Sequence, residues 1–382
     1  MSLSEIRISD FRNFSQQTLN PCQDINFVVG ENGSGKTSLL EAIYYLSRGR
    51  SFNTSTHSKV IRFEQESFVV SGKVANTLDH NKDDNNDSSD DMPIGIRRHR
   101  NNDIEIRVDG QSEKKLSSLA KVLPVQLITP NSLVLFFGGP KERRHFFDFG
   151  LFHVKQSFYQ DWLRFSKIHK HRNALLKKRP RFYNEEFEYW DAEFCRLAEI
   201  ISQNRLEYLD LFHQQFDKIN VNIDSFLTTA EMGFELYRGY HVDIPLAEQL
   251  KSAFQKDVKF GYTSVGPHKS DVRIKCENRP IQDVFSRGQA KLLLYVIKLL
   301  QSDIISEHNL RPVMLIDDIG SEVDKNNLKK IFEFLQSSKE TQFFISSLDQ
   351  DIAGYLIEDA KDHSMFHVKH GTIKQLIGNK YE

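Results

Sequence analysis

Apolar and polar residues follow two different patterns along this chain. Short apolar or alternating runs at residues 25–29, 104–108, 272–276 and 313–316 predict β-strands, because side chains alternate between the faces of a strand. From residue 141 to about 220 the spacing becomes helical. The apolar residues that recur there at every third or fourth position are Phe187, Trp190, Phe194, Leu197 and Ile201. Such a seam predicts a helical hairpin packed on a neighbour rather than a long coiled coil.

An α/β pattern interrupted by a helical one predicts one head split by an inserted arm. Because strand and helix patterns alternate again from about residue 255, we expect residues 1–139 and 255–382 to form a P-loop-type α/β head. We expect residues 140–254 to form the α-helical arm. The segment from Asp79 to Asp91 contains no apolar residue, so it cannot bury enough surface to offset the entropy lost on ordering. We therefore predict a disordered acidic insertion at residues 79–91.

The strongest chemical signal follows the first of these strands. Residues 30–37 fit G-x-x-x-x-G-K-[ST] at every fixed position, between a predicted strand at 25–29 and a predicted helix at 38–46. In this motif glycines let backbone N–H groups approach phosphates, lysine reaches the β- and γ-phosphates, and the hydroxyl ligates Mg²⁺. The residues predicted to bind the nucleotide are Gly30, Glu31, Asn32, Gly33, Ser34, Gly35, Lys36 and Thr37. The motif predicts ATP and Mg²⁺ as cofactors, with Thr37 as a metal ligand.

Two later segments complete the candidate site. Four apolar residues at 313–316 precede Asp317 and Asp318, the form of a Walker B strand. Asp317 is predicted to hold Mg²⁺, and Asp318 to orient or deprotonate the attacking water. Ser286 stands at a predicted helix start followed by Gly288 and Gln289. This start is either a capped helix and nothing more, or a second anion site for a γ-phosphate.

Composition limits the function classes. The chain has 51 Lys and Arg against 52 Asp and Glu, so a nucleic-acid role must depend on a local patch. The three cysteines lie far apart and form no C-x-x-C, which supports neither a zinc finger nor a disulfide framework. No signal peptide or long apolar run is present. We expect a cytoplasmic protein and exclude a membrane-spanning transporter subunit, though not an ATPase partner of one.

One local patch is strongly basic. Residues 167–181 contain seven Lys or Arg and no acidic residue. They are either a stripe that follows DNA phosphates or an ordinary solvated helix face. The candidate DNA-binding residues are Lys167, Lys170, Arg172, Lys177, Lys178, Arg179 and Arg181. No aromatic residues interleave this run in a recognisable motif, so we expect any DNA binding to be sequence-nonspecific.

The order of these motifs resembles that of the ABC-type ATPases, and their amino-acid sequences resemble those of the bacterial RecF family. The similar stretches are residues 11–14 (FRNF), 30–52, 124–130, 138–148, 266–271, 286–291 and 315–324. They run in the family's order from end to end. The resemblance implies that Gln126 is a Q-loop residue serving catalysis and Mg²⁺, that Arg12 and Asn13 lie near the nucleotide, and that residues 321–324 form a D-loop. Ser286 would then act on the nucleotide of a partner subunit.

The RecF family resemblance implies an ATP-dependent DNA-binding protein of replication and recombinational repair. Two copies would dimerise on ATP, bind duplex DNA near single-strand gaps and help RecO and RecR to load recombinase. Asp318 stands where transporters have Glu, which favours a weak DNA-stimulated ATPase that acts as a clamp rather than a motor. Ser346 to Asp349 replace the usual switch histidine, so the γ-phosphate sensor stays open. The alternatives are an ABC-type ATPase with an associated nuclease, and a scaffold with a vestigial ATPase.

Overall fold

The computed structural model describes residues 2–75, 91–223, 232–320, 323–338, 340–355 and 362–376. The backbone forms two compact units. The head unit comprises Met1–Ser132 and Leu294–Glu382, and the arm unit comprises Leu133–Leu293. Of the predicted acidic insertion only Asp91 is described, and residues 321 and 322 of the predicted D-loop also lie outside the described residues.

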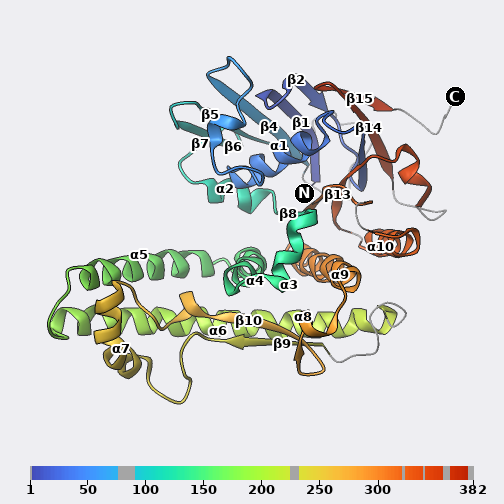
Figure 1. The fold of residues 1–382 in the computed structure, drawn as a ribbon. Coiled ribbons are helices and arrows are strands. Elements are labelled where there is room, and N and C mark those ends of the chain that lie inside the picture. Colours follow the sequence, from blue (N-terminus) through green and yellow to red (C-terminus); the bar gives the residue numbers. More distant parts are fainter. Residues whose placement is uncertain are drawn as a thin grey trace. The chain divides into compact units, whose positions relative to one another are not determined.

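Within its described residues the head unit contains two six-stranded sheets (Figure 1). The first is antiparallel and has the order β2-β1-β4-β5-β6-β7. Its strands are β1 (Ser2–Phe11), β2 (Phe14–Leu19), β4 (Ser67–Ala75), β5 (Met92–His99), β6 (Ile104–Val108) and β7 (Gln111–Glu113). Residues along β4 alternate between buried and half-buried positions, as expected for an antiparallel strand with one covered face.

The second sheet has the order β15-β14-β3-β13-β12-β8. Its strands are β3 (Ile25–Val29), β8 (Val125–Ile128), β12 (Val313–Ile316), β13 (Gln342–Ser347), β14 (His363–Lys369) and β15 (Thr372–Leu376). Every neighbouring pair is parallel except β14 with β15. The strands β3, β12 and β13 are buried along their whole length, because helices or a second sheet cover both faces of such strands. The strands predicted at residues 25–29 and 313–316 are confirmed.

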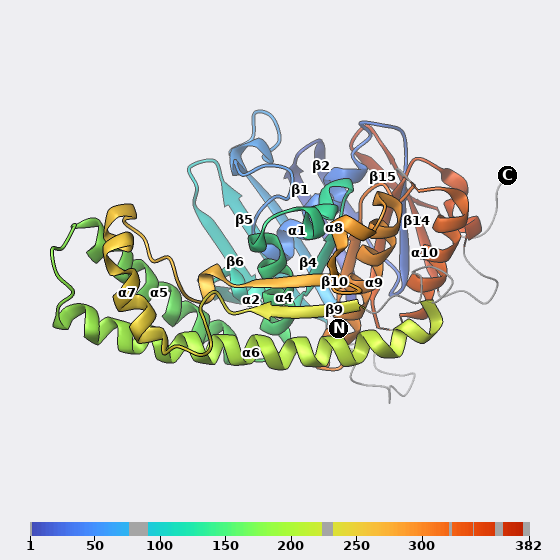
Figure 2. The ribbon, with the colours of Figure 1, turned by 60° about the horizontal axis from the view of Figure 1, so that its bottom comes forward.

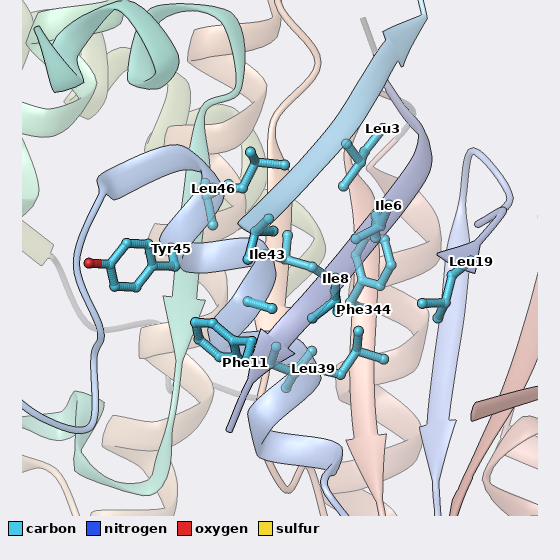
Figure 3. Packing of buried hydrophobic residues seen from close by; sticks show 14 of the residues in the cluster. Leu3, Ile6, Ile8, Phe11, Leu19, Leu39, Ile43, Tyr45, Leu46 and Phe344 are labelled. Carbon is cyan, nitrogen blue, oxygen red and sulfur yellow. The ribbon is translucent and has the colours of Figure 1, made fainter. Parts of the chain in front are cut away.

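One hydrophobic cluster joins the two sheets of the head unit through α1 (Lys36–Arg48). Its members from β1, α1 and β13 include Leu3, Ile6, Ile8, Leu39, Ile43, Leu46 and Phe344 (Figure 3). All seven are fully buried. The remaining short elements of this unit are η1 (His57–Lys59), α2 (Leu116–Val122), α10 (Lys325–Ser337) and η4 (Gln350–Tyr355). The cluster fixes the start of α1 against the sheet edge where the site lies.

The parallel strands bring distant segments of the chain to one edge. Ser347 of β13 pairs with Val29 of β3, and Ile316 of β12 pairs with Ile345 of β13. The loop that begins at Gly30 and the carboxylates that follow Ile316 therefore leave the sheet at the same edge. Ligands of α/β sheets bind at this carboxyl edge.

The arm unit is built on long helices that lie side by side (Figures 1 and 2). Its described helices are α3 (Val134–Phe137), α4 (Pro140–Val154), α5 (Phe158–Lys177), α6 (Glu185–Ile223), α7 (Leu246–Phe260), η3 (Pro267–Lys269) and α8 (Ile281–Val284). Two further elements, η2 (Pro130–Leu133) and α9 (Arg287–Ser306), cross the division between the units. The apolar seam predicted on the long helix is confirmed, since Phe187, Phe194, Leu197 and Ile201 are buried.

Both domain boundaries differ from the sequence prediction. Residues 133–139 and 255–293 were expected in the head, but they belong to the arm unit. The reason for the second of these ranges is a small sheet of β9 (Met232–Tyr237), β10 (Asp271–Cys276) and β11 (Arg279–Pro280), in which β10 pairs antiparallel with β9. A strand at residues 272–276 was predicted correctly, but its partner lies in the arm. None of the described helices is long and apolar enough to span a membrane.

Candidate nucleotide-binding site

Backbone conformation shapes the loop between β3 and α1. Gly30, Gly33 and Gly35 have φ values of 155°, 75° and 121°, a region that side chains with a Cβ rarely adopt. A Cβ on Gly30 would lie 2.3 Å from the carbonyl oxygen of Val368, and one on Gly35 would lie 2.6 Å from Nδ2 of Asn13. The loop therefore needs glycine at both positions for steric reasons as well as conformational ones.

The start of α1 has backbone donors free for an anion. Gly35 is its N-cap residue, no side chain caps it, and no acidic residue lies in its first turn. The first N–H groups of a helix lack intrahelical partners and, with the helix dipole, attract phosphate. The hydroxyl oxygen of Ser34 is buried and has no hydrogen-bond partner among the described residues. Both observations fit a bound nucleotide phosphate.

Lys36 is folded back onto its own loop. Its Nζ donates to the carbonyl oxygens of Gly30 at 2.7 Å and Glu31 at 3.0 Å. Burial lowers the pKa of Lys36, and the carboxylates of Asp318 and Asp317 oppose this shift. The ammonium group is thus a cation at the mouth of the loop, held by neutral acceptors that a phosphate would replace.

Two hydroxyl groups donate hydrogen bonds to the Asp317 carboxylate and so connect three segments at the sheet edge. The Thr37 hydroxyl donates to Asp317, with distances of 3.0 and 3.2 Å to the two carboxylate oxygens. The Ser346 hydroxyl also donates to Asp317, at 2.8 Å. Burial raises the pKa of the Asp317 carboxyl, and the hydrogen bonds from Ser346 and Thr37 oppose the rise. A carboxylate next to a threonine hydroxyl is the oxygen-rich pair that a hard cation such as Mg²⁺ prefers.

Asp318, the next residue along the chain, is held by the same Ser346 hydroxyl. Its backbone has a φ of 56°, and its N–H donates to the Ser346 hydroxyl at 2.8 Å. Left-handed conformations cost free energy in residues other than glycine and tend to occur where a side chain must be aimed. Here the turn directs Asp318 into the wall of the cavity that also contains Lys36 and Thr37.

Arg12 and Asn13, which the family resemblance places near the nucleotide, lie at the same cavity. Asn13 Nδ2 donates to the carbonyl oxygen of Ser34 at 3.0 Å, so it holds the loop directly. Arg12 makes two 2.8 Å hydrogen bonds to the buried carboxylate of Glu41 and a third, at 3.0 Å, to the Lys59 carbonyl. This fork fixes the guanidinium at the rim of the cavity.

The cavity has a volume of about 610 Å³. Such a volume suits a ligand of nucleotide size. Its lining residues are Arg12, Asn13, Asn32, Gly33, Gly35, Lys36, Thr37, Ser38, Lys59, Ile61, Pro130, Asp317, Asp318, Ser346 and Leu348. The structure thus brings together most of the predicted loop, both predicted carboxylates, and Arg12 and Asn13.

Sequence reasoning missed several lining residues. Lys59 and Ile61 come from the segment between α1 and β4, and Pro130 follows β8. Ser346 was noted only as part of the segment that replaces a switch histidine, without its contact to Asp317. The available signal was its place directly after the apolar run Phe343–Ile345, because polar residues at the carboxyl ends of such strands face the ligand edge.

The structure places the Gln126 side chain inside the head unit and not at the cavity. Its side chain is buried, and Nε2 donates to the carbonyl of Lys298 at 3.0 Å and to the Ser302 hydroxyl at 2.9 Å. In the sheet Gln126 pairs with Met314, well before the strand end at Ile316. Gln126 therefore supports α9 from inside the head and is not part of the cavity wall. Its Oε1 is buried and has no hydrogen-bond partner among the described residues, and its predicted roles toward Mg²⁺ and water stay predictions.

At the start of α9, Ser286 and Gln289 cap each other. The Ser286 N–H donates to the side-chain oxygen of Gln289 at 2.9 Å, and the Gln289 N–H donates to the Ser286 hydroxyl at 3.3 Å. This reciprocal pair is a capping box. Ser286 and Gly288 are exposed. The capped-helix interpretation is confirmed, and a role in binding a partner's nucleotide stays a prediction.

The basic run on the arm unit loses one candidate. Lys167, Lys170, Lys177, Lys178, Arg179 and Arg181 are exposed. Arg172 is fully buried and pairs with Asp191 at 2.8 Å and Asp257 at 3.0 Å. Its prediction as a DNA-binding residue is wrong, because its guanidinium is saturated by carboxylates inside the helical packing.

Comparison with known proteins gives consistent matches along the chain. Residues 2–374 match the family model described as RecF/RecN/SMC N terminal domain. The DNA replication and repair protein RecF of Pseudoalteromonas translucida is 42% identical over 375 residues, covering 98% of this chain and 99% of that protein. RecF of Vibrio vulnificus is 39% identical over 378 residues, covering 98% and 100%.

Solved structures agree. The recombination mediator protein RecF–ATP in the RecFOR pathway superposes with a TM-score of 0.81 at 26% identity, covering 98% of this chain and 97% of that chain. The Smc head domain from Pyrococcus furiosus, bound to the C-terminal domain of ScpA, has a TM-score of 0.57 at 15% identity, with 98% and 96% covered. The latter likeness concerns the fold alone.

Proposed function

The chain belongs to the RecF family of DNA replication and repair proteins, and on this premise we propose that it binds ATP and Mg²⁺ in the cavity of the head unit. ATP would hold two copies together as a dimer that retains DNA at single-strand gaps. RecO and RecR would be its partners in loading recombinase. Slow hydrolysis would then release the DNA.

The observation that carries this proposal is the contact between Thr37, Asp317 and Ser346 beside Lys36. It joins the P-loop to the Walker B carboxylate across segments far apart in the chain, with Thr37 Oγ1 3.0 Å from Asp317. In P-loop ATPases the threonine hydroxyl and this carboxylate hold Mg²⁺, which neutralises charge on the β- and γ-phosphates. The uncapped start of α1 and the glycine backbone would hold the phosphates themselves.

Each catalytic side chain would have a distinct task. Lys36 would leave the Gly30 and Glu31 carbonyls and donate to phosphate oxygens. Asp318 would accept a hydrogen bond from the attacking water, and its short side chain favours slow turnover. Arg12, fixed by Glu41, would line the nucleotide's outer side. Ser286 of the second copy, with the free N–H groups of α9, would contact the γ-phosphate and so make dimerisation depend on ATP.

The Asp318→Asn variant tests the proposal. The substitution keeps the size of the side chain but removes the acceptor charge, so we expect ATP binding to persist and turnover to fall by about 100-fold or more. Size-exclusion chromatography with light scattering should give a dimer with ATP and a monomer without it. A Lys36→Ala variant serves as the control that binds no ATP and stays monomeric. A monomeric Asp318→Asn protein at saturating ATP would disprove the ATP-dependent dimer.

The nuclease alternative is not part of this proposal, since no contact described above favours it over an ATPase. It remains directly testable. Incubating the protein with labelled single- and double-stranded DNA in Mg²⁺ or Mn²⁺ should leave both substrates intact under conditions that support ATP hydrolysis.

A further inference from the structure

Two exposed aromatic rings lie among lysines on the arm unit. Phe260 ends α7 and is 52% exposed, and Tyr262 follows it and is 44% exposed. Their rings stack with centroids 5.7 Å apart at 26°. Exposed large rings stacked on each other are unusual on a water-facing surface, where apolar side chains of this size normally find cover.

Three lysines frame these rings. The Lys269 ammonium lies 5.0 Å from the centroid of the Tyr262 ring. Lys177, at the end of α5, lies next to Gly261, since a Cβ on Gly261 would be 3.3 Å from its Cγ. We call Lys170, Lys177, Phe260, Tyr262 and Lys269 the aromatic–basic surface.

Lys170 joins this surface through its neighbour. His169 and His268 stack with centroids 4.0 Å apart, so the residues that follow them, Lys170 and Lys269, come from adjoining segments. Lys170 and Lys177 also lie seven residues apart on α5, two helical turns along the same side. Figure 2 shows α5 and α7 side by side at one end of the arm unit.

The surface carries uncompensated positive charge. Residues 162–184 and 258–270 contain no Asp or Glu. Lys155, Lys251 and Lys275 each form an ion pair with a glutamate elsewhere on the arm unit. Lys170, Lys177 and Lys269 are exposed and are not among them. An anion with a flat apolar component would satisfy both the charges and the rings.

We infer that the aromatic–basic surface binds single-stranded DNA. Bases would stack on Phe260 and Tyr262, and the phosphates between them would contact Lys170, Lys177 and Lys269. Proteins that bind single strands without sequence preference combine aromatic platforms with a basic groove in this way. A duplex fits less well, because its bases already stack on each other and offer only phosphates to a flat surface.

This inference deepens the DNA-binding part of the proposed function and rests on it. It assigns the single strand of a gap to one end of the arm unit, independently of the nucleotide cavity. It also changes the sequence-based expectation. The basic run at residues 167–181 lacks interleaved aromatics in the sequence, and α7 and the following turn supply them in the fold.

The test compares DNA affinities of the full-length protein. A Phe260→Ser/Tyr262→Ser double variant should lose about tenfold or more in affinity for a fluorescent oligo(dT) strand, measured by anisotropy, because each stacked base contributes a substantial share of binding. Its affinity for a blunt duplex, its ATP-dependent dimerisation and its ATP turnover should not change. Tyr189→Ser is the matched control, since Tyr189 is 72% exposed on α6 but close in sequence to Glu186, Glu188 and Glu193.

A gain-of-signal variant separates contact from folding. Tyr262→Trp keeps a stacking ring, so this variant should bind oligo(dT) with the affinity of the wild type. Oligo(dT) should quench the fluorescence that the added tryptophan contributes. Unchanged oligo(dT) affinity in the double variant, or an equal loss in the Tyr189→Ser control, overturns the inference. The inference is also overturned if the double variant loses affinity for a poly-glutamate peptide but keeps its affinity for oligo(dT). A wild-type protein that binds no DNA would instead refute the proposed function itself.

Discussion

Ser346 is the residue through which both carboxylates of the site are connected. One hydroxyl donates to Asp317 and accepts the N–H of Asp318. It therefore sets the orientation of Asp317, the proposed metal ligand, and the turn that aims Asp318, the proposed catalytic carboxylate. A side chain with a single rotatable hydroxyl at the end of a buried strand can do both at little entropic cost.

We expect Ser346→Ala to lower ATP turnover by about tenfold or more, since loss of one partner leaves a buried carboxylate short of a hydrogen bond. The requirement for Mg²⁺ should also rise, because a less fixed Asp317 holds the cation more weakly. Steady-state hydrolysis measured against Mg²⁺ concentration checks both effects. Ser347→Ala is the control, because Ser347 is similarly buried but, among the described residues, its hydroxyl accepts from the Asp349 N–H and contacts neither carboxylate of the site. Equal losses in both variants would contradict the role given to Ser346.

Among single residues, the sequence predicted those that belong to a short motif with a known chemical role. Lys36, Thr37, Asp317 and Asp318 lie at the cavity because a short motif fixes their local geometry. Gln126 does not line the cavity, because a residue two positions before the end of a strand lies about 7 Å further from the ligand edge. The sequence pattern does not show which residue of the strand lies at the carboxyl edge of the sheet.

Among the helices of the arm unit, Arg172 makes the contacts that connect α5, α6 and α7. It lies on α5 and pairs with Asp191 of α6 and Asp257 of α7, and it also donates to Thr263. Three helices therefore converge on one buried guanidinium. From the sequence it was one of seven basic residues in a run, because a single helix pattern does not reveal the carboxylates that neighbouring helices supply.

We expect Arg172→Met to destabilise the arm unit by about 3–5 kcal/mol, because two buried carboxylates lose their counter-charge. Both tryptophans, Trp162 and Trp190, lie on arm helices, so urea unfolding followed by tryptophan fluorescence reports this unit alone. Lys167→Met on the exposed side of α5 should change stability by no more than about 0.5 kcal/mol. Adding Asp191→Asn and Asp257→Asn to Arg172→Met should recover part of the loss. A stable single variant would show that the pairs contribute little.

The stacked histidines give the arm unit a dependence on pH. Burial, the largest cause, lowers the pKa of His169 to about 4 and that of His268 to about 3. In the unfolded chain both should titrate near the ordinary value of about 6.5. Between those values the unfolded state binds more protons than the folded state, so stability is complete above about pH 6.5 and falls as the pH drops toward 4.

We therefore expect His169→Phe to lose less stability than the wild type between pH 7.5 and pH 5. Phenylalanine keeps a ring against Phe165 and His268 but cannot take up a proton. Urea unfolding by tryptophan fluorescence at the two pH values measures the difference. His213→Gln is the control, because the His213 side chain is 43% accessible on α6 beside Asp217. If all three proteins lose equal stability, the buried pair does not control the effect.

The boundary of the arm is the clearest case in which elements were predicted but their assembly was not. The strand at Asp271–Cys276 was visible as an alternating run, yet its hydrogen-bonding partner is Met232–Tyr237. Pairing between strands depends on long-range contacts, whereas alternation is a local property. By contrast, Ile25–Val29 and Val313–Ile316 were predicted with their observed bounds, because continuous apolar strands belong to a sheet covered on both faces.

For the whole molecule, the nucleotide cavity needs segments from both ends of the chain. The P-loop follows β3, and Asp317 follows β12 in the same parallel sheet. A fragment of either end would lack half of the cavity. The predicted role of Ser286 goes one step further, because it makes a complete site depend on two copies of the chain. That dependence can be tested without a structure of the dimer.

Mixing two inactive variants tests whether Ser286 acts on the partner's nucleotide. Lys36→Ala removes the P-loop cation, and Ser286→Arg blocks the start of α9. Each variant alone should hydrolyse ATP at a background rate. In a mixed dimer the intact P-loop of one copy would face the intact Ser286 of the other, so an equimolar mixture should recover about a quarter of wild-type turnover for a two-fold symmetric pair. Mixing either variant with the double variant is the control and should recover nothing. If the equimolar mixture stays at background although light scattering detects mixed dimers, Ser286 acts within its own chain or not at all.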